Sequence, residues 1–173
     1  RSHDPVFTDD RAGRLGELWD LLADLHAAGI AHRQLEEDQL TLCAGRIGLV
    51  GFDGATVAPT TAQLRSDEAQ MFVTTVGLVG RDAAIEGLLE HRSSEQIDAL
   101  LPYLQPTALT ADQRRMLKVL DVDLDELRAA VALAAEVEAP DLVQLRRFSI
   151  GTVVQIALPA LALFLLISAL AGF

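Results

Sequence analysis

The sequence predicts a mainly helical protein: a body of amphipathic helices with one short β-hairpin, followed by a single transmembrane helix. Half of the 173 residues are hydrophobic but only 5% are aromatic, and such a composition, dominated by alanine and leucine, favours helices. Apolar residues recur at three-and-four spacing, as on the buried face of a helix. The third observation is that residues 150–173 contain no charged side chain.

The first part of the body is divided by its turn residues. Residues 1–10 hold a proline and several aspartates and are expected to be irregular. Residues 11–28 are expected to form the first helix, which Gly29 ends. Two short apolar runs, residues 40–42 and 47–50, flank a glycine-containing turn and predict the hairpin.

The rest of the body is expected to be helical, with a loop at residues 57–64. The helices are predicted at residues 67–79, 82–90, 93–102, 110–120, 124–137 and 141–148. Two of them begin with Ser/Thr-x-x-Gln, a capping box whose side chains bind free amides of the first turn. The acidic run from Asp121 resembles a calcium loop, but Glu126 and Ala132 stand where Gly and Glu are needed. Asp123 is therefore expected to cap a helix.

Charge and composition exclude several functions. The formal charge is −11 and the chain has no basic patch, which excludes nucleic-acid binding. Cys43 is the single cysteine, so no intramolecular disulfide and no cysteine-rich zinc site can form. Neither a metal site nor a cofactor is expected.

Residues 25–55, LHAAGIAHRQLEEDQLTLCAGRIGLVGFDGA, carry the main functional prediction. They resemble the catalytic loop and metal-binding turn of the protein-kinase-like fold, including the aminoglycoside-phosphotransferase branch. The family pattern is a helix ending in L-H-x-x-G-I-x, then H-R-D-L-x-x-x-N, a hairpin and I-D-F-G. The resemblance implies a kinase-like C-lobe, with His32, Arg33 and Asp67 in structural roles around the loop.

Three departures from the family pattern fall on the reactive positions. Gln34 replaces the catalytic Asp, Gln39 the metal-binding Asn, and Gly51 the metal-binding Asp. In phosphoryl transfer the loop Asp accepts the hydroxyl proton, and the other two residues hold magnesium. A glutamine has no useful basicity and a glycine has no ligand atom in its side chain. The sequence therefore predicts a pseudokinase that has no catalytic residue and does not bind ATP.

Two further observations bear on residual activity. The only lysine, Lys118, lies in a helical pattern far downstream, and neither the lysine strand nor the Gly-rich loop of a kinase small lobe is present. Asp53 lies two residues beyond Gly51 and could restore a metal ligand if the turn were rebuilt.

The C-terminal segment predicts a membrane anchor. A helix over residues 150–173 would be about 36 Å long, more than the hydrocarbon core of a bilayer. Arg146 and Arg147 precede it and no charge follows; they would lie at the membrane interface and place the body in the cytoplasm. The expected organisation is an irregular segment at 1–10, a cytoplasmic kinase-like lobe at 11–148 and a transmembrane helix at 149–173.

Residues 100–109 (LLPYLQPTAL), with the later LRAAV helix and LRRFS junction, are similar to a larger bacterial architecture. In it, a degenerate kinase-like cytoplasmic domain precedes a multi-span module of the lysylphosphatidylglycerol-synthase transmembrane (flippase-like) family. This resemblance implies a fragment of a polytopic protein of the bacterial inner membrane. The implied partners are membrane lipid and other transmembrane helices, of the same protein or of another.

These observations together predict a non-catalytic, pseudokinase-like cytoplasmic domain. It would regulate or scaffold an integral membrane protein, a flippase-like module that transports or binds lipid. Two alternatives stay open: a residual magnesium- and ATP-dependent phosphotransferase, and a single-span accessory subunit of a membrane complex. Magnesium-dependent nucleotide binding would favour the phosphotransferase.

Overall fold

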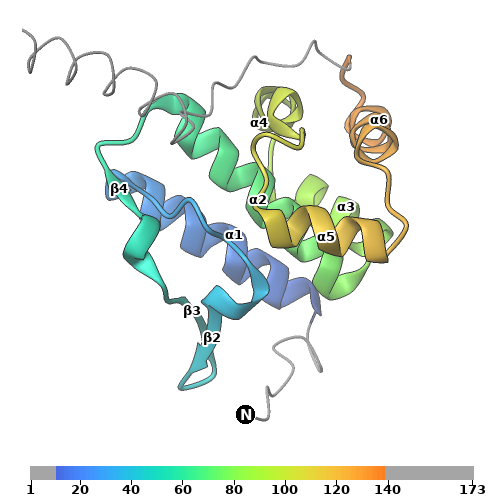
Figure 1. Ribbon diagram of the computed structural model, residues 1–173. Helices are drawn as coiled ribbons and strands as arrows, with labels where there is room; N and C mark the ends of the chain where they lie inside the picture. The colour runs from blue at the N-terminus through green and yellow to red at the C-terminus, as the bar shows by residue number, and fades with distance from the viewer. Residues whose placement is uncertain (1–10, 139–173) are drawn as a thin grey trace, which may run out of the picture. The chain divides into compact units, whose positions relative to one another are not determined.

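The computed structural model describes residues 11–138, which form a mainly helical body with two small sheets (Figure 1). The helices are α1 (Arg11–Ala27), α2 (Thr61–Val79), α3 (Arg81–His91), α4 (Ser94–Leu100), α5 (Ala111–Val119) and α6 (Leu124–Ala134). The strands are β1 (Ile30–Ala31), β2 (Leu40–Cys43), β3 (Arg46–Leu49) and β4 (Thr56–Val57). Three short 3₁₀ turns are η1 (Glu37–Gln39), η2 (Phe52–Gly54) and η3 (Leu101–Tyr103).

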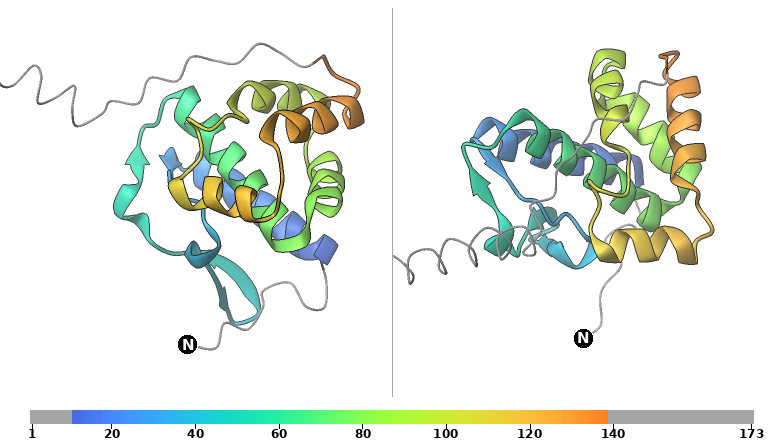
Figure 2. Two further views of the ribbon diagram at one scale, coloured as in Figure 1. Left: turned by 45° about the vertical axis from the view of Figure 1, so that its right-hand side comes forward. Right: turned by 45° about the horizontal axis from the view of Figure 1, so that its top comes forward.

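Helix α2 is the element on which the others pack. It contacts α1, α3, α4 and α5, and the two views of Figure 2 show it running between α1 and α5. Its middle residues, from Asp67 to Val76, are nearly all buried. Phe72 of α2 and Trp19 of α1 are the largest fully buried side chains among the described residues. The core therefore forms where α1 and α2 meet, and α2 also contacts the loop that follows β1.

Both sheets lie in the segment between α1 and α2. In the predicted hairpin, β2 pairs with β3 in antiparallel register, and α1 fixes it because Glu17 Oε1 accepts a hydrogen bond from the Ile47 amide at 2.9 Å. The pairing of β1 with β4, Ile30 with Val57 and Ala31 with Thr56, was not predicted. Each of these strands has two residues, too few for a periodic pattern. Their pairing closes residues 30–57 into one large loop.

Most predicted helices are confirmed within one or two residues, and their side-chain caps explain where they begin. The predicted boxes Ser93/Gln96 and Thr110/Gln113 both form. The N-cap at Asp123 is also confirmed, with its carboxylate accepting from the amides of residues 125 and 126. A third box, Thr60/Gln63, starts α2 six residues before the predicted position. Residues 61–64, predicted as loop, are therefore helical.

An arginine joins the end of α3 to α1. The Arg92 guanidinium lies over the Trp19 ring, 4.6 Å from its centre, and Nη2 donates to the Trp19 carbonyl at 3.1 Å. Burial lowers the pKa of Arg92, while the carboxylates of Glu68 and Asp20 oppose this shift. Arginine nevertheless remains charged in proteins, so the contact is a cation–π pair that also satisfies a backbone carbonyl.

The predicted fold class is wrong in its membrane part. Within residues 11–138, no helix is both long and apolar enough to cross a bilayer. The longest, α2, has 19 residues but carries Arg65, Asp67 and Glu68. What the structure shows is a mainly helical body with two small sheets and, in the part of the chain that it describes, no transmembrane helix. The predicted helices at 141–148 and 149–173 lie outside the described residues, as do Arg146 and Arg147.

Candidate functional site

A buried carboxylate holds the start of the loop at residues 32–39. Asp67, in α2, is fully buried, and its two oxygens accept from the amides of His32 at 2.6 Å and Arg33 at 2.8 Å. His26 Nε2 lies 3.4 Å from the same carboxylate. Bonds between a carboxylate and backbone amides are charge-assisted and stronger than neutral ones. Asp67 thus ties the end of α1 and the loop to the central helix.

Arg33 has the backbone conformation that this bonding requires. Its φ is +69°, a left-handed region that residues other than glycine rarely enter. The side chain is exposed, and its guanidinium donates to Thr56 Oγ1 at 3.3 Å. Arg33 therefore connects the loop to β4.

His32 packs inside the body and contacts the turn that follows the hairpin. Its side chain is fully buried, and Nε2 lies 2.9 Å from the Val50 carbonyl. Since a carbonyl only accepts, Nε2 carries the proton and Nδ1 has no partner. The ring also meets Phe52 edge-on at 4.8 Å between centroids. These contacts join His32 to the turn that follows the hairpin.

Gln39 and Gly51 lie against each other, so two of the departures from the kinase pattern are in direct contact. A Cβ atom added to Gly51 would overlap Oε1 of Gln39 and lie 2.7 Å from its Cδ. The backbones are joined as well, because the Val50 amide donates to the Gln39 carbonyl at 2.9 Å. Gly51 has φ +76°, in the region that glycine enters most readily. The glutamine carboxamide therefore fills the space that a side chain at position 51 would need.

Gln34, the third departure, covers the other end of the same turn. A Cβ added to Gly54 would lie 3.2 Å from Gln34 Cδ. Between the two glycines, Asp53 is exposed in the middle of η2. Among residues 11–138, no group of three or more His, Cys, Asp or Glu side chains is arranged to hold a metal ion. The structure thus brings Gln34, Gln39 and Gly51 to one turn, and places Asp53 in no such group.

Two buried glutamines, missed by the sequence reasoning, hold the middle of the loop. Gln70 of α2 accepts from the Leu35 amide at 3.1 Å, and Gln113 of α5 donates to the Leu35 carbonyl at 2.9 Å. The Gln113 amide also donates to the Gln70 carbonyl at 2.9 Å and to Thr74 Oγ1 at 3.0 Å. For Gln113 the sequence indicated only a place in a capping box, which does not predict burial. For Gln70 it indicated nothing.

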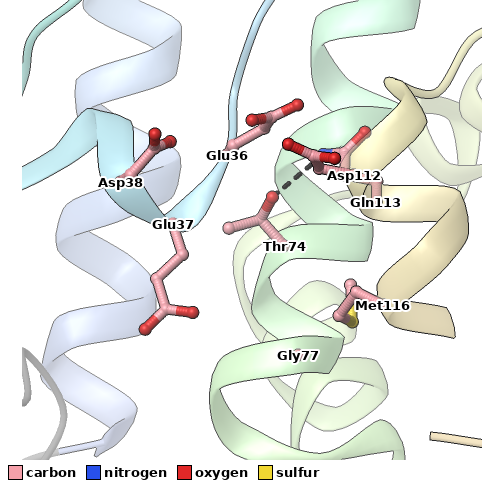
Figure 3. Close-up of a pocket in the computed structure, with 8 residues that line it drawn as sticks. All are labelled: Glu36, Glu37, Asp38, Thr74, Gly77, Asp112, Gln113 and Met116. Atoms are coloured by element: carbon pink, nitrogen blue, oxygen red, sulfur yellow. Dashed lines mark hydrogen bonds between the residues drawn. The ribbon is translucent and has the colours of Figure 1, made fainter. Parts of the chain in front are cut away.

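An acidic cleft of about 440 Å³ opens beside the loop (Figure 3). One wall carries the carboxylates of Glu36, Glu37 and Asp38, and the opposite wall carries that of Asp112 from α5. The remaining lining residues are neutral: Thr74, Gly77, Gln113 and Met116. The dashed line in Figure 3 is the bond from Gln113 to Thr74 at the base of the cleft.

The charge of the cleft limits what it can bind. Among the described residues, Asp112 pairs with Arg115 at 2.6 Å, in an exposed contact, and no ion pair involves Glu36 or Glu37. No lysine or arginine lines the cleft. Carboxylates that face each other repel anions such as phosphate, so the cleft is unsuited to the triphosphate of a nucleotide.

The sequence and the fold were compared with family models, with curated proteins and with solved structures. None of the three comparisons gives a match.

Proposed function

We propose that residues 11–138 form a catalytically inactive, kinase-like lobe that acts by binding a partner and not by transferring phosphate. One observation carries the proposal: the Gln39 carboxamide occupies the space above Gly51. In the kinase pattern, the side chain at that place would be a magnesium ligand. Here a neutral amide fills it.

The arrangement around this turn supports the kinase-like part of the proposal. Asp67, from the helix after the turn, bonds the amides of His32 and Arg33, as the resemblance implies. A hairpin separates that loop from the Gly51–Gly54 turn, and His32 bridges back to Val50. The element order of helix, loop, hairpin, turn and buried helix is the order that the motif requires.

The chemistry of the site supports the proposal that the lobe is catalytically inactive. Gln34 stands at the place of the general base, and an amide cannot accept the proton of a substrate hydroxyl at neutral pH. Magnesium prefers several hard oxygen ligands in octahedral geometry, and Asp53 alone offers one exposed carboxylate. The four carboxylates of the neighbouring cleft would in addition disfavour a nucleotide.

The partner that we propose is a bacterial membrane protein of the flippase-like kind, which the lobe would regulate or scaffold. The support is the resemblance of residues 100–109, the LRAAV helix and the LRRFS junction to that bacterial architecture. In the fold these residues span the end of α4, η3 and the turn before α5.

Millimolar ATP with magnesium is expected to leave the thermal unfolding midpoint of the full chain unchanged within about 1 °C. A ligand stabilises a protein appreciably only when its concentration approaches or exceeds its dissociation constant. Among residues 11–138, no group of three or more His, Cys, Asp or Glu side chains is arranged to hold a metal ion, and no lysine or arginine lines the cleft. The measurement is a thermal shift assay with ATP, with and without magnesium, and with magnesium alone.

The variants Asp53→Ala and Asp98→Ala serve as a pair in the same assay. Both residues are exposed aspartates, but Asp98 lies in α4 away from the turn. A magnesium-dependent rise of several degrees that disappears in Asp53→Ala and persists in Asp98→Ala would refute the inactive lobe and identify a residual phosphotransferase site.

A further inference from the structure

The loop at residues 32–39 contacts the turn at residues 50–54 through three of its residues. His32 bonds the Val50 carbonyl and packs against Phe52. Gln39 bonds the Val50 amide through its carbonyl and lies on Gly51 through its side chain. Gln34 lies on Gly54. All of these contacts come from residues of the same loop.

We propose that Gln34 and Gln39 form a clamp that holds the turn at residues 50–54 in one conformation without a bound metal ion. The clamp follows from the contacts alone, so it stands whether or not the lobe is related to kinases. Each carboxamide packs over a glycine of the turn and occupies space that a side chain on that glycine would need. The glutamines and glycines are therefore matched pairs, 39 with 51 and 34 with 54.

The turn would need such support, because its own bonds are few. Within it, the Ala55 amide bonds the Phe52 carbonyl at 3.1 Å, and η2 has no side-chain cap. Gly51 adopts positive φ, and glycine loses more conformational freedom on folding than any other residue. Phe52 is 45% exposed, so burial of its ring stabilises the turn only in part. The carboxamides supply contacts that the turn lacks.

The first test is amide hydrogen exchange on the full chain with the double substitution Gln34→Ala/Gln39→Ala. We expect the amides of Val50 and Ala55 to exchange about tenfold faster, since local opening becomes easier when packing contacts are lost. The buried amides of α2 should keep their native protection, which shows that the body remains folded. Magnesium should not change the exchange of the native turn.

Gln96→Ala is the matched control for this measurement. Gln96 belongs to the capping box of α4, a helix that packs against α2, α3 and η3. Its removal should speed exchange only at the start of α4. Unchanged exchange at Val50 and Ala55 in the double variant, or slower exchange of the native turn with magnesium, would overturn the clamp.

A double-mutant cycle between positions 39 and 51 tests the pairing directly. Gly51→Ala adds a Cβ at positive φ and also displaces the Gln39 carboxamide. In the Gln39→Ala background only the backbone strain remains. We therefore expect Gly51→Ala to lower the unfolding midpoint less in that background, by a difference of about 2 °C or more, since interacting residues are not additive.

Equal losses in the two backgrounds would show that the carboxamide contributes nothing to the turn, and would overturn the clamp. The result is independent of nucleotide binding. The mutant cycle could show no coupling between positions 39 and 51 in a protein that does not bind ATP. It could equally show coupling in a protein that binds ATP at another site.

Discussion

Replacing Asp67 with alanine is expected to lower the free energy of unfolding by about 3–5 kcal/mol. The carboxylate is fully buried and accepts from two backbone amides of the loop, at 2.6 and 2.8 Å. A hydrogen bond to a charged group contributes about 1.5–3 kcal/mol, and an unsatisfied buried amide adds its desolvation penalty. Arg33, at φ +69°, would also lose the bond that holds its backbone. Urea unfolding of the full chain measures the loss.

Two comparisons make this prediction specific. Asp67→Asn keeps one carbonyl oxygen but turns an NH₂ group toward a backbone N–H, so it should retain only part of the stability. Asp98→Ala removes an exposed aspartate from α4 and should change the free energy by less than about 0.5 kcal/mol. A loss below about 1 kcal/mol for Asp67→Ala would mean that the loop is held by other contacts.

Gln113→Ala is expected to lower the free energy of unfolding by about 2–4 kcal/mol. The side chain is 3% exposed and donates to the carbonyls of Leu35 and Gln70 and to the hydroxyl of Thr74. It also accepts from the Thr110 amide, which closes the capping box of α5. The two N–H groups of the amide are shared among these three acceptors, and each neutral hydrogen bond contributes about 1 kcal/mol. The Leu35 carbonyl keeps the bond from the Thr74 hydroxyl.

Gln96 again offers a matched control, because it fills the same place in the capping box of α4 but is exposed. Gln96→Ala removes only the exposed reciprocal bond of the box and leaves the Ser93 cap in place, so it should cost about 0.5 kcal/mol. The difference between the two losses, measured by the same urea titration, gives the contribution of the buried network. Equal losses would show that Gln113 acts only as a cap.

The sequence was informative where a local pattern determines the structure. Side-chain caps at Ser93, Thr110 and Asp123 marked three helix starts, and each is present. Three-and-four spacing located α1, and two short apolar runs located the hairpin. These features depend on residues within a few positions of each other, so their physical cause is visible in the order of the residues.

Features that join distant segments could not be predicted in this way. The β1–β4 pairing connects strands of two residues each, and neither strand has a pattern of its own. Glutamine in a helix is usually exposed, so nothing marked Gln70 and Gln113 as buried partners of Leu35. Gln39 and Gly51 were recognised separately as departures from a motif, but their contact depends on the fold of the turn.

The helix starts of this acidic chain differ in the charge of their caps. The boxes at α2, α4 and α5 use glutamine as the reciprocal partner, so both side chains of each box are neutral. At α6 the cap is instead the Asp123 carboxylate, which accepts at 2.8 and 3.0 Å. A carboxylate also complements the positive end of the helix dipole, an effect that salt screens. Among these four helices, the first turn of α6 should therefore lose the most protection when the salt concentration is raised, in a residue-resolved hydrogen-exchange measurement.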